Sequence, residues 1–402
     1  MSALAEAELG DVAEFIRGIT FKPDDVVPVG TPGSAACMRT KNVQTELDLS
    51  DVWGIPESLV RRDDQYLIPG DMLVSSANSW NLVGKCCWVP SLPWRSTFGG
   101  FISALRPNPA KVDPRYLFRW FASDRTQTTV RSFGQQTTNI SNLNVDRCLR
   151  LKLRLPPLPE QRRIAEILDK ADALRAKRRA ALAQLDTLTQ SIFLAMFGDP
   201  ATNPKGWPQV AIGDHASKIG SGATPRGGEE AYKASGTTLI RSMNVRDGMF
   251  LRDGLAFIDG EQAAQLEGVV VEADDVLLNI TGASVARVCR APADVLPARV
   301  NQHVAIIRPT ATFSPLFLEQ CLLSPSVKER LLKIARAGAT REAITKSAIE
   351  QFRIIHPPRE VQDEFAGRVE ARDKTHIQMS SALAGMDSLF ASLQHRAFRG
   401  EL

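Results

Sequence analysis

The stretch LPPLPEQRRIAEILDKADAL, residues 155–174, opens a long apolar repeat that decides how the chain is organised. Between here and residue 197, one row of residues is spaced seven apart and consists of Ile164, Ala171, Arg178, Leu185 and Ile192. A second apolar row, three residues further on, consists of Ile167, Leu174, Ala181 and Leu188. This spacing predicts a helix with an apolar stripe, and Gly198 and Pro200 mark its end. At 1.5 Å per residue the helix would be about 58 Å long.

The same stretch recurs in the second half of the chain. Pro156-Pro157, Gln161 and Phe197 return 201 residues later as Pro357-Pro358, Gln362 and Phe398. Earlier segments also match, with small shifts of the kind that loops of variable length produce. The matched segments are 38–43 with 240–245, 69–74 with 273–278, 102–107 with 304–309, and 134–141 with 338–345. The chain is therefore an internal repeat of about half its length.

This repeat predicts an α/β fold with two similar, sheet-rich domains, residues 1–155 and 200–356. Short runs of branched and aromatic residues alternate there with Gly, Pro and Asn turn signals. Each domain is followed by a spacer helix, in segments 156–199 and 357–402. We expect the two helices to pack as an antiparallel pair that holds the domains at a fixed separation. The alternative is that each helix packs only on its own globular half.

Length and composition exclude several classes of protein. The chain has 402 residues, 44% hydrophobic and 23% charged, which are ordinary values for two or three globular domains. No apolar run approaches the roughly 18 to 20 residues that span a bilayer, and acidic residues stand where a secretory signal would need basic ones. We therefore expect a cytoplasmic protein without a membrane segment. Six cysteines without a CxxC motif predict free structural thiols.

The sequence contains none of the common catalytic motifs. The chain has no phosphate loop, no HExxH, no GxSxG and no Asn-Pro-Pro-aromatic signature of adenine methyltransferases, and its five histidines are scattered. The net charge is only +4. Residues 147–179, however, carry eleven basic and four acidic side chains, a local excess that indicates either a polyanion partner or a solvated helix face. A binding module fits this pattern better than an enzyme.

Two pairs of loops have side chains that can read the edges of bases. Arginine and lysine bind guanine, and asparagine and glutamine bind adenine. The candidates in the first half are Arg39, Lys41, Asn42, Gln44, Gln135, Gln136, Thr137 and Asn139, and those in the second half are Arg241, Asn244, Arg246, Thr340 and Arg341. Phosphate contact or plain solvation is the alternative for each of them. The five tryptophans of the first half could stack on bases, although core packing is the more ordinary role. Because the loops of the two domains differ, the target would be bipartite and asymmetric.

These residues resemble the specificity subunit of type I restriction-modification systems, HsdS. The strongest match is the segment 155–174, which looks like the family's central region before the spacer helix. The segment 220–225, GSGATP, resembles the opening of a target recognition domain, and we add Thr224 and Arg226 to the candidate DNA-binding residues on this ground. The segments 279–285 and 301–306 also match the family.

The resemblance implies a non-catalytic subunit that binds double-stranded DNA and recruits two modification subunits. Those partners would bring S-adenosylmethionine and methylate adenine, and restriction subunits would bring ATP, Mg²⁺, translocation and cleavage. This chain would hold no cofactor or metal of its own. Two alternatives stay open: a self-contained DNA methyltransferase or nuclease, which would bind S-adenosylmethionine, and a protein-only coiled-coil scaffold, which would show no salt-dependent DNA binding.

Overall fold

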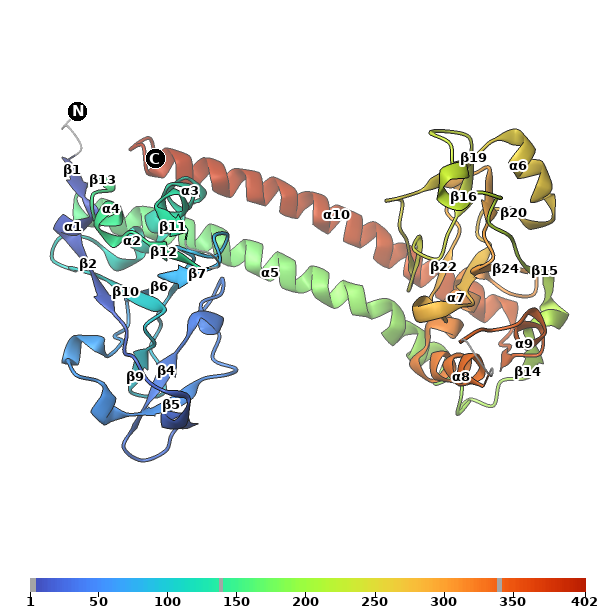
Figure 1. Cartoon of the computed structure of the whole chain (residues 1–402), viewed down its shortest axis with the longest axis horizontal. Helices are drawn as coiled ribbons and strands as arrows, with labels where there is room; N and C mark the ends of the chain where they lie inside the picture. The colour runs from blue at the N-terminus through green and yellow to red at the C-terminus, as the bar shows by residue number, and fades with distance from the viewer. Residues whose placement is uncertain (1–4, 137–139, 338–341) are drawn as a thin grey trace. The chain divides into compact units, whose positions relative to one another are not determined.

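The computed structural model describes residues 5–136, 140–337 and 342–402 and divides into two compact units (Figure 1). Unit 1 takes in residues 1–179 and 381–402, and unit 2 takes in residues 180–380. Both units are larger than the globular domains expected from the sequence, because each also includes parts of the two long helices.

Unit 1 is built on a four-stranded antiparallel sheet whose strands lie in the order β2-β10-β6-β8. Their bounds are β2 Ala13–Arg17, β10 Ile102–Pro107, β6 Met72–Ser75 and β8 Cys86–Trp88. A second sheet has the order β3-β5-β4-β9, with β3 Val27–Pro28, β5 Trp53–Pro56, β4 Ser34–Met38 and β9 Ser96–Phe98. In this second sheet β4 and β9 run parallel.

Shorter elements close unit 1 around these sheets. The first strand pairs with the strand that leads into the first long helix, and a separate small sheet has the strand order β11-β12-β7. The remaining bounds are β1 Ala5–Glu8, β13 Lys152–Leu155, β11 Gly134–Gln136, β12 Ser141–Leu143, β7 Ala77–Asn78, α1 Leu9–Val12, α2 Pro114–Phe121, α3 Asp124–Ser132 and α4 Val145–Leu149. Pro114 begins α2, and the side chain of Asp113 caps it by accepting from the backbone N–H of Tyr116.

Unit 2 repeats the strand order of the main sheet, and three strands of its second sheet pair as in unit 1. Its main sheet has the order β15-β24-β21-β22, and its second sheet the order β19-β16-β23-β20, in which β16 and β23 run parallel. The strands are β14 Gln209–Ala211, β15 Ala216–Ser221, β16 Thr237–Ile240, β17 Val245–Arg246, β18 Met249–Phe250, β19 Ala256–Ile258, β20 Val270–Val271, β21 Val276–Asn279, β22 Val288–Arg290, β23 Ala298–Val300, β24 Val304–Pro309 and β25 Arg353–Ile355. The short helices are α6 Gly260–Gln265, α7 Pro315–Leu323, α8 Pro325–Arg336 and α9 Lys346–Glu350.

The same buried ion pair stabilises the main sheet of each unit. Arg106 forks onto Asp71 in unit 1, with N–O distances of 2.8 and 2.7 Å, and Arg308 forks onto Asp275 in unit 2 at 2.8 and 2.8 Å. Both aspartates are buried. Because each arginine also donates to a backbone carbonyl, each buried carboxylate is paired by a donor that is itself held in place.

A buried glutamine fixes the start of each long helix, α5 (Leu158–Phe197) and α10 (Arg359–Ala397). The amide oxygen of Gln161 accepts from the backbone N–H of Asp113 at 2.8 Å, and its amide nitrogen donates to the carbonyl of Pro156 at 2.8 Å. Gln362 makes the same pair of bonds, with Ser314 at 2.8 Å and Pro357 at 2.9 Å. The glutamine that recurs in the sequence repeat therefore joins each helix to the domain before it.

The two helices contribute to both cores. In unit 1 the beginning of α5, at Ile164 and Leu168, is buried together with Phe390 near the end of α10. In unit 2 the end of α5, at Phe193 and Phe197, is buried beside the beginning of α10. The helices are antiparallel, and the alternative in which each packs only on its own half is wrong.

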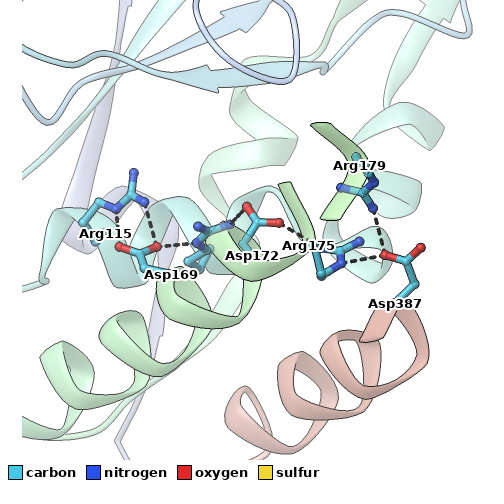
Figure 2. Close-up of polar contacts among 7 residues, drawn as sticks. Arg115, Asp169, Asp172, Arg175, Arg179 and Asp387 are labelled. Atoms are coloured by element: carbon cyan, nitrogen blue, oxygen red, sulfur yellow. Dashed lines mark hydrogen bonds and ion pairs between the residues drawn. The ribbon is translucent and has the colours of Figure 1, made fainter. Parts of the chain in front are cut away.

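A chain of ion pairs links α2, α5 and α10 within unit 1 (Figure 2). Asp169 accepts from Arg115 at 2.7 and 2.8 Å, and Arg175 donates to Asp172 at 2.9 Å and to Asp387 at 2.6 Å. The bond from Arg175 holds the pKa of Asp387 below its usual value. Burial alone would raise the pKa of Asp169, but the arginines bonded to it lower that pKa overall. Asp169 and Asp387 therefore stay charged at neutral pH.

Helix α5 contains a stretch that is long and apolar enough to cross a membrane by length and composition alone. The sequence expectation that no stretch approaches this limit is wrong on that measure. A single helix of this kind is weak evidence of a membrane span, and the apolar side chains of Phe193 and Phe197 lie in the protein core.

All six cysteines are free, and five of them are buried. Burial raises the pKa of Cys37 and of Cys148 to about 12, which keeps both as thiols at neutral pH. The prediction of free structural thiols is confirmed.

Candidate nucleic-acid interface

The two asparagines expected to read bases hold their own loops instead. Asn42 and Asn244 are both 0% exposed. The amide oxygen of each accepts from the backbone N–H three residues earlier, Arg39 at 2.8 Å and Arg241 at 3.0 Å. Their amide nitrogens donate to carbonyls further along the same loops. With every amide group bonded inside the protein, these side chains shape the loop, and the expectation of a base contact is corrected on this ground.

The arginines that begin these loops are also bound within the protein. The guanidinium of Arg39 lies 3.5 Å from the centre of the Trp53 ring and 3.1 Å from a carboxylate oxygen of Asp51. Arg241 donates to Glu229 at 3.0 Å and to the carbonyl of Gly254 at 2.7 Å. A base contact by either arginine would require its ion pair to open.

Several other candidates lie at the surface. Arg226 is exposed, and so are Lys41, Gln44 and Gln135, although Lys41 pairs with Asp51 at 2.7 Å and the amide oxygen of Gln44 accepts from Lys85 at 2.6 Å. Thr224 and Arg246 are half-buried, and Gln136 is the last residue of β11. Thr137, Asn139, Thr340 and Arg341 lie outside the described residues. The DNA contacts of this whole set stay predictions.

Two aromatic side chains of unit 1 are exposed: Trp80, one of the five tryptophans expected either to stack on bases or to pack in the core, and Phe101, which was not among the candidates. Trp80 is 56% exposed and Phe101 is 63% exposed, whereas Trp120 is buried as expected for a core tryptophan. The carbonyl of Phe101 accepts from the backbone N–H groups of Ser76 and Ala77, both at 3.0 Å. The turn residues Asn78, Ser79 and Asn81 around Trp80 were the signal that could have placed it on a loop.

In unit 2 three of the segments that carried the family resemblance meet in space. Thr224 follows β15, Thr281 follows β21, and Gln302 with His303 precedes β24. Their side chains form one hydrogen-bonded series. The carbonyl of His303 accepts from the backbone N–H of Ile280 at 3.0 Å, as that of Phe101 accepts from the end of β6 in unit 1. His303 therefore occupies the place of Phe101, so the two units present different side chains at the same point of the fold.

The described residues hold no group of three or more His, Cys, Asp or Glu side chains that could bind a metal ion. What the site offers instead is a set of loops with exposed polar, basic and aromatic side chains at the strand ends of each unit. Such loops suit the recognition of a polar, negatively charged ligand.

Comparison with known proteins identifies relatives along the whole chain. Residues 1–184 match the family model described as the type I restriction modification DNA specificity domain. The type I restriction enzyme EcoKI specificity subunit of Escherichia coli strain K12 is 24% identical over 98% of this chain and 88% of its own length. The StySPI specificity subunit of Salmonella potsdam is 26% identical over 99% of this chain and 89% of its own length.

Solved structures share the fold. A chain from a study of complex assembly and conformational transition of the type I R-M system aligns with a TM-score of 0.64 at 17% identity, covering 100% of this chain and 99% of that one. The HsdS subunit from Thermoanaerobacter tengcongensis aligns with a TM-score of 0.51 at 17% identity, covering 100% and 98%.

Proposed function

We infer from the similarity of this chain to type I restriction-modification specificity subunits that it belongs to their family and selects the DNA sequence on which a modification complex acts. The observation that carries this function is the repeat in three dimensions. The two units share the strand order of their main sheet, their buried Arg–Asp fork and their helix-anchoring glutamine, yet they differ at exposed loop positions. Each unit is therefore suited to read its own short sequence, and the two together specify a bipartite, asymmetric target.

Catalysis is assigned to partner proteins. We propose that this chain has no catalytic role and that modification subunits bring S-adenosylmethionine, while restriction subunits bring ATP and Mg²⁺. The lack of a candidate metal group among the described residues is compatible with this division. We expect the assembled complex to work in the cytoplasm, where its double-stranded DNA target lies.

The long helices offer a surface for the modification subunits. Leu188 in unit 2 and Leu389 in unit 1 are 201 residues apart in the sequence repeat, and both are exposed. Leu174 and Ile377 on the same two helices are exposed as well. Because exposed apolar side chains on a folded protein often mark protein contacts, we propose that each unit recruits one modification subunit through this helix surface.

Methylation mapping tests the function. The chain is co-expressed with the modification subunit encoded beside it, and methylated adenines are mapped across the host genome. We expect methylation at one bipartite, asymmetric motif that disappears when this chain is omitted.

The other outcomes identify the alternatives. Methylation that is absent, or that persists without this chain, removes the DNA-reading role and favours a protein-only scaffold. S-adenosylmethionine binding by the purified chain alone would instead favour a self-contained methyltransferase.

A further inference from the structure

We propose that Thr224 is a specificity-determining residue of unit 2, whose hydroxyl oxygen is presented to DNA as a hydrogen-bond acceptor by a relay through Gln302, His303 and Thr281. This inference rests on the proposed function and names the chemical group that one point of the site recognises.

The relay is a continuous series of three side-chain contacts. The hydroxyl of Thr224 lies 2.5 Å from the amide oxygen of Gln302, and the amide nitrogen of Gln302 lies 3.1 Å from Nε2 of His303. Nδ1 of His303 lies 2.6 Å from the hydroxyl of Thr281. The series thus runs from the loop after β15 to the end of β21.

The backbone brings these loops into contact. The N–H of Gly222 donates to the carbonyl of Asn301 at 3.1 Å, and the N–H of His303 donates to the side-chain oxygen of Asn301 at 3.0 Å. A side chain at residue 222 would place its Cβ only 1.8 Å from the carbonyl oxygen of Val300, so this approach requires glycine. The loop carrying Thr224 is therefore held directly against Gln302.

The chemistry of the relay sets the direction of its hydrogen bonds. An amide oxygen can only accept, so the Thr224 hydroxyl must donate its proton to Gln302. The amide nitrogen of Gln302 can only donate, so Nε2 of His303 accepts and Nδ1 carries the proton that it donates to Thr281. The proton of Thr224 is therefore used inside the protein, while its oxygen lone pairs remain to accept a bond from outside.

An acceptor at this position selects between bases. In the major groove, adenine N6 and cytosine N4 are the amino donors, whereas guanine and thymine present carbonyl oxygens. We expect Thr224 to favour adenine or cytosine at one position of the half-site that unit 2 reads. Unit 1 has Ala77, Gly100 and Phe101 at the places of Thr281, Gln302 and His303, so it lacks these polar groups.

The test is base preference in the assembled complex. The full chain is assembled with its modification subunits, and methylation is measured on a plasmid library in which both half-sites are randomised. We expect Thr224→Val, which removes the hydroxyl but keeps the shape, to reduce the adenine or cytosine preference at one position by roughly 3- to 10-fold. Gln302→Leu should reduce the same preference by a smaller factor, because the hydroxyl remains but can turn freely.

Two control variants each retain one part of the relay. Thr224→Ser retains the hydroxyl, and Gln302→Glu retains an acceptor facing Thr224, so both should keep the preference. Ratios between bases are compared, since the added charge of Gln302→Glu would weaken all DNA binding alike. Continued recognition of the half-site of unit 1 by each variant shows that the complex is folded.

The result that would overturn the relay is an unchanged base preference in Thr224→Val or in Gln302→Leu. Loss of a preference for guanine or thymine in Thr224→Val would also overturn it, because that pattern requires a donor. Failure of the proposed function looks different: the unsubstituted complex would then show no base preference in either half-site.

Discussion

The two units are alike inside and different outside. Asn42 and Asn244 hold equivalent loops with equivalent bonds, and the Arg106–Asp71 fork matches the Arg308–Asp275 fork. At the surface, an exposed Phe101 stands where unit 2 has His303 in a polar relay. The repeated residues build the fold, and the residues that differ are the ones able to give each unit its own target.

The largest expected effect tests how the two cores use the helix ends. Phe197 and Phe398 are equivalent in the repeat but differ in burial. Phe197 is fully buried, and its ring centre lies 4.8 to 5.5 Å from those of Phe193, Phe317 and Phe365. Phe398 is half-buried and packs against the ring of Tyr116. Phe197→Ala should lower the free energy of unfolding of unit 2 by about 3 to 5 kcal/mol. Phe398→Ala should cost unit 1 about 1 to 2 kcal/mol, since less apolar area is lost. Hydrogen exchange of the main-sheet amides measures each unit separately, and equal costs would contradict this difference.

The next effect tests whether the helix surfaces are equivalent. Leu188→Asp and Leu389→Asp should each remove one modification subunit from the complex, and the double variant should remove both. Each leucine would be buried when the modification subunit binds, so its loss should weaken that contact by about 1.5 to 3 kcal/mol. The fold of this chain should be unaffected, because both side chains are exposed in it. Native mass spectrometry gives the stoichiometry. A single variant that loses both subunits, or neither, would show that the two surfaces are not equivalent and independent.

A smaller effect tests the surface difference. Because Phe101 occupies the place of His303, we expect it to contact DNA, and Phe101→Ala should weaken recognition of the half-site of unit 1 by about 1 kcal/mol, the lower end of base stacking. Phe101→Tyr, which keeps the ring, serves as the control. Methylation of the randomised library measures both. If Phe101→Ala weakened recognition of both half-sites equally, Phe101 would have no role in reading the sequence.

The smallest effect concerns the contacts between the helices. In unit 1, Asp387 pairs with Arg175 at 2.6 Å, and the equivalent pair in unit 2 is Asp186 with His376 at 3.2 Å. Arginine is always charged and can bond a carboxylate through two N–H groups, so His376→Arg should stabilise unit 2 by up to about 0.5 kcal/mol, and less in high salt. Thermal unfolding at two salt concentrations measures this gain. His376→Gln, which carries no charge, should give none of it.

The unit 1 pair also predicts a response to acid. The pKa of Asp387 is lowered by its bond to Arg175, so this pair stabilises the folded state above the ordinary aspartate pKa of about 3.9. That stabilisation is lost as the pH falls through the lower pKa of the folded state. Asp387→Asn should remove this part of the acid response, and an unchanged profile would contradict it.

The sequence predicted the architecture well because the repeat and the helix pattern are local signals. The 201-residue offset and the apolar stripe were enough to expect two similar α/β domains and an antiparallel helix pair. That each core contains the start of one long helix and the end of the other was not predicted. The apolar stripe of a helix does not say which core Phe193 or Phe390 enters. The predicted fixed separation between the domains stays a prediction.

The candidate site was predicted less well. Asparagine and arginine can bind bases, so the repeated Arg39–Asn42 and Arg241–Asn244 segments looked like reading loops. Their recurrence in both halves instead reflects a shared loop structure, held by bonds that the residue types alone do not reveal. The Thr224 relay joins residues up to 79 positions apart, and such contacts depend on the folded chain.

The assignment of residues 381–402 to unit 1 has a consequence for synthesis on the ribosome. Unit 2 is one continuous stretch and can complete its core as soon as it has emerged. Unit 1 must wait for Phe390 and Ala397, which close the core around Ile164 and Leu168. At about 5 to 20 residues per second, this delay is roughly 10 to 45 s, during which the first-made half of the chain has an open apolar core. The unit translated first is thus the last to finish folding.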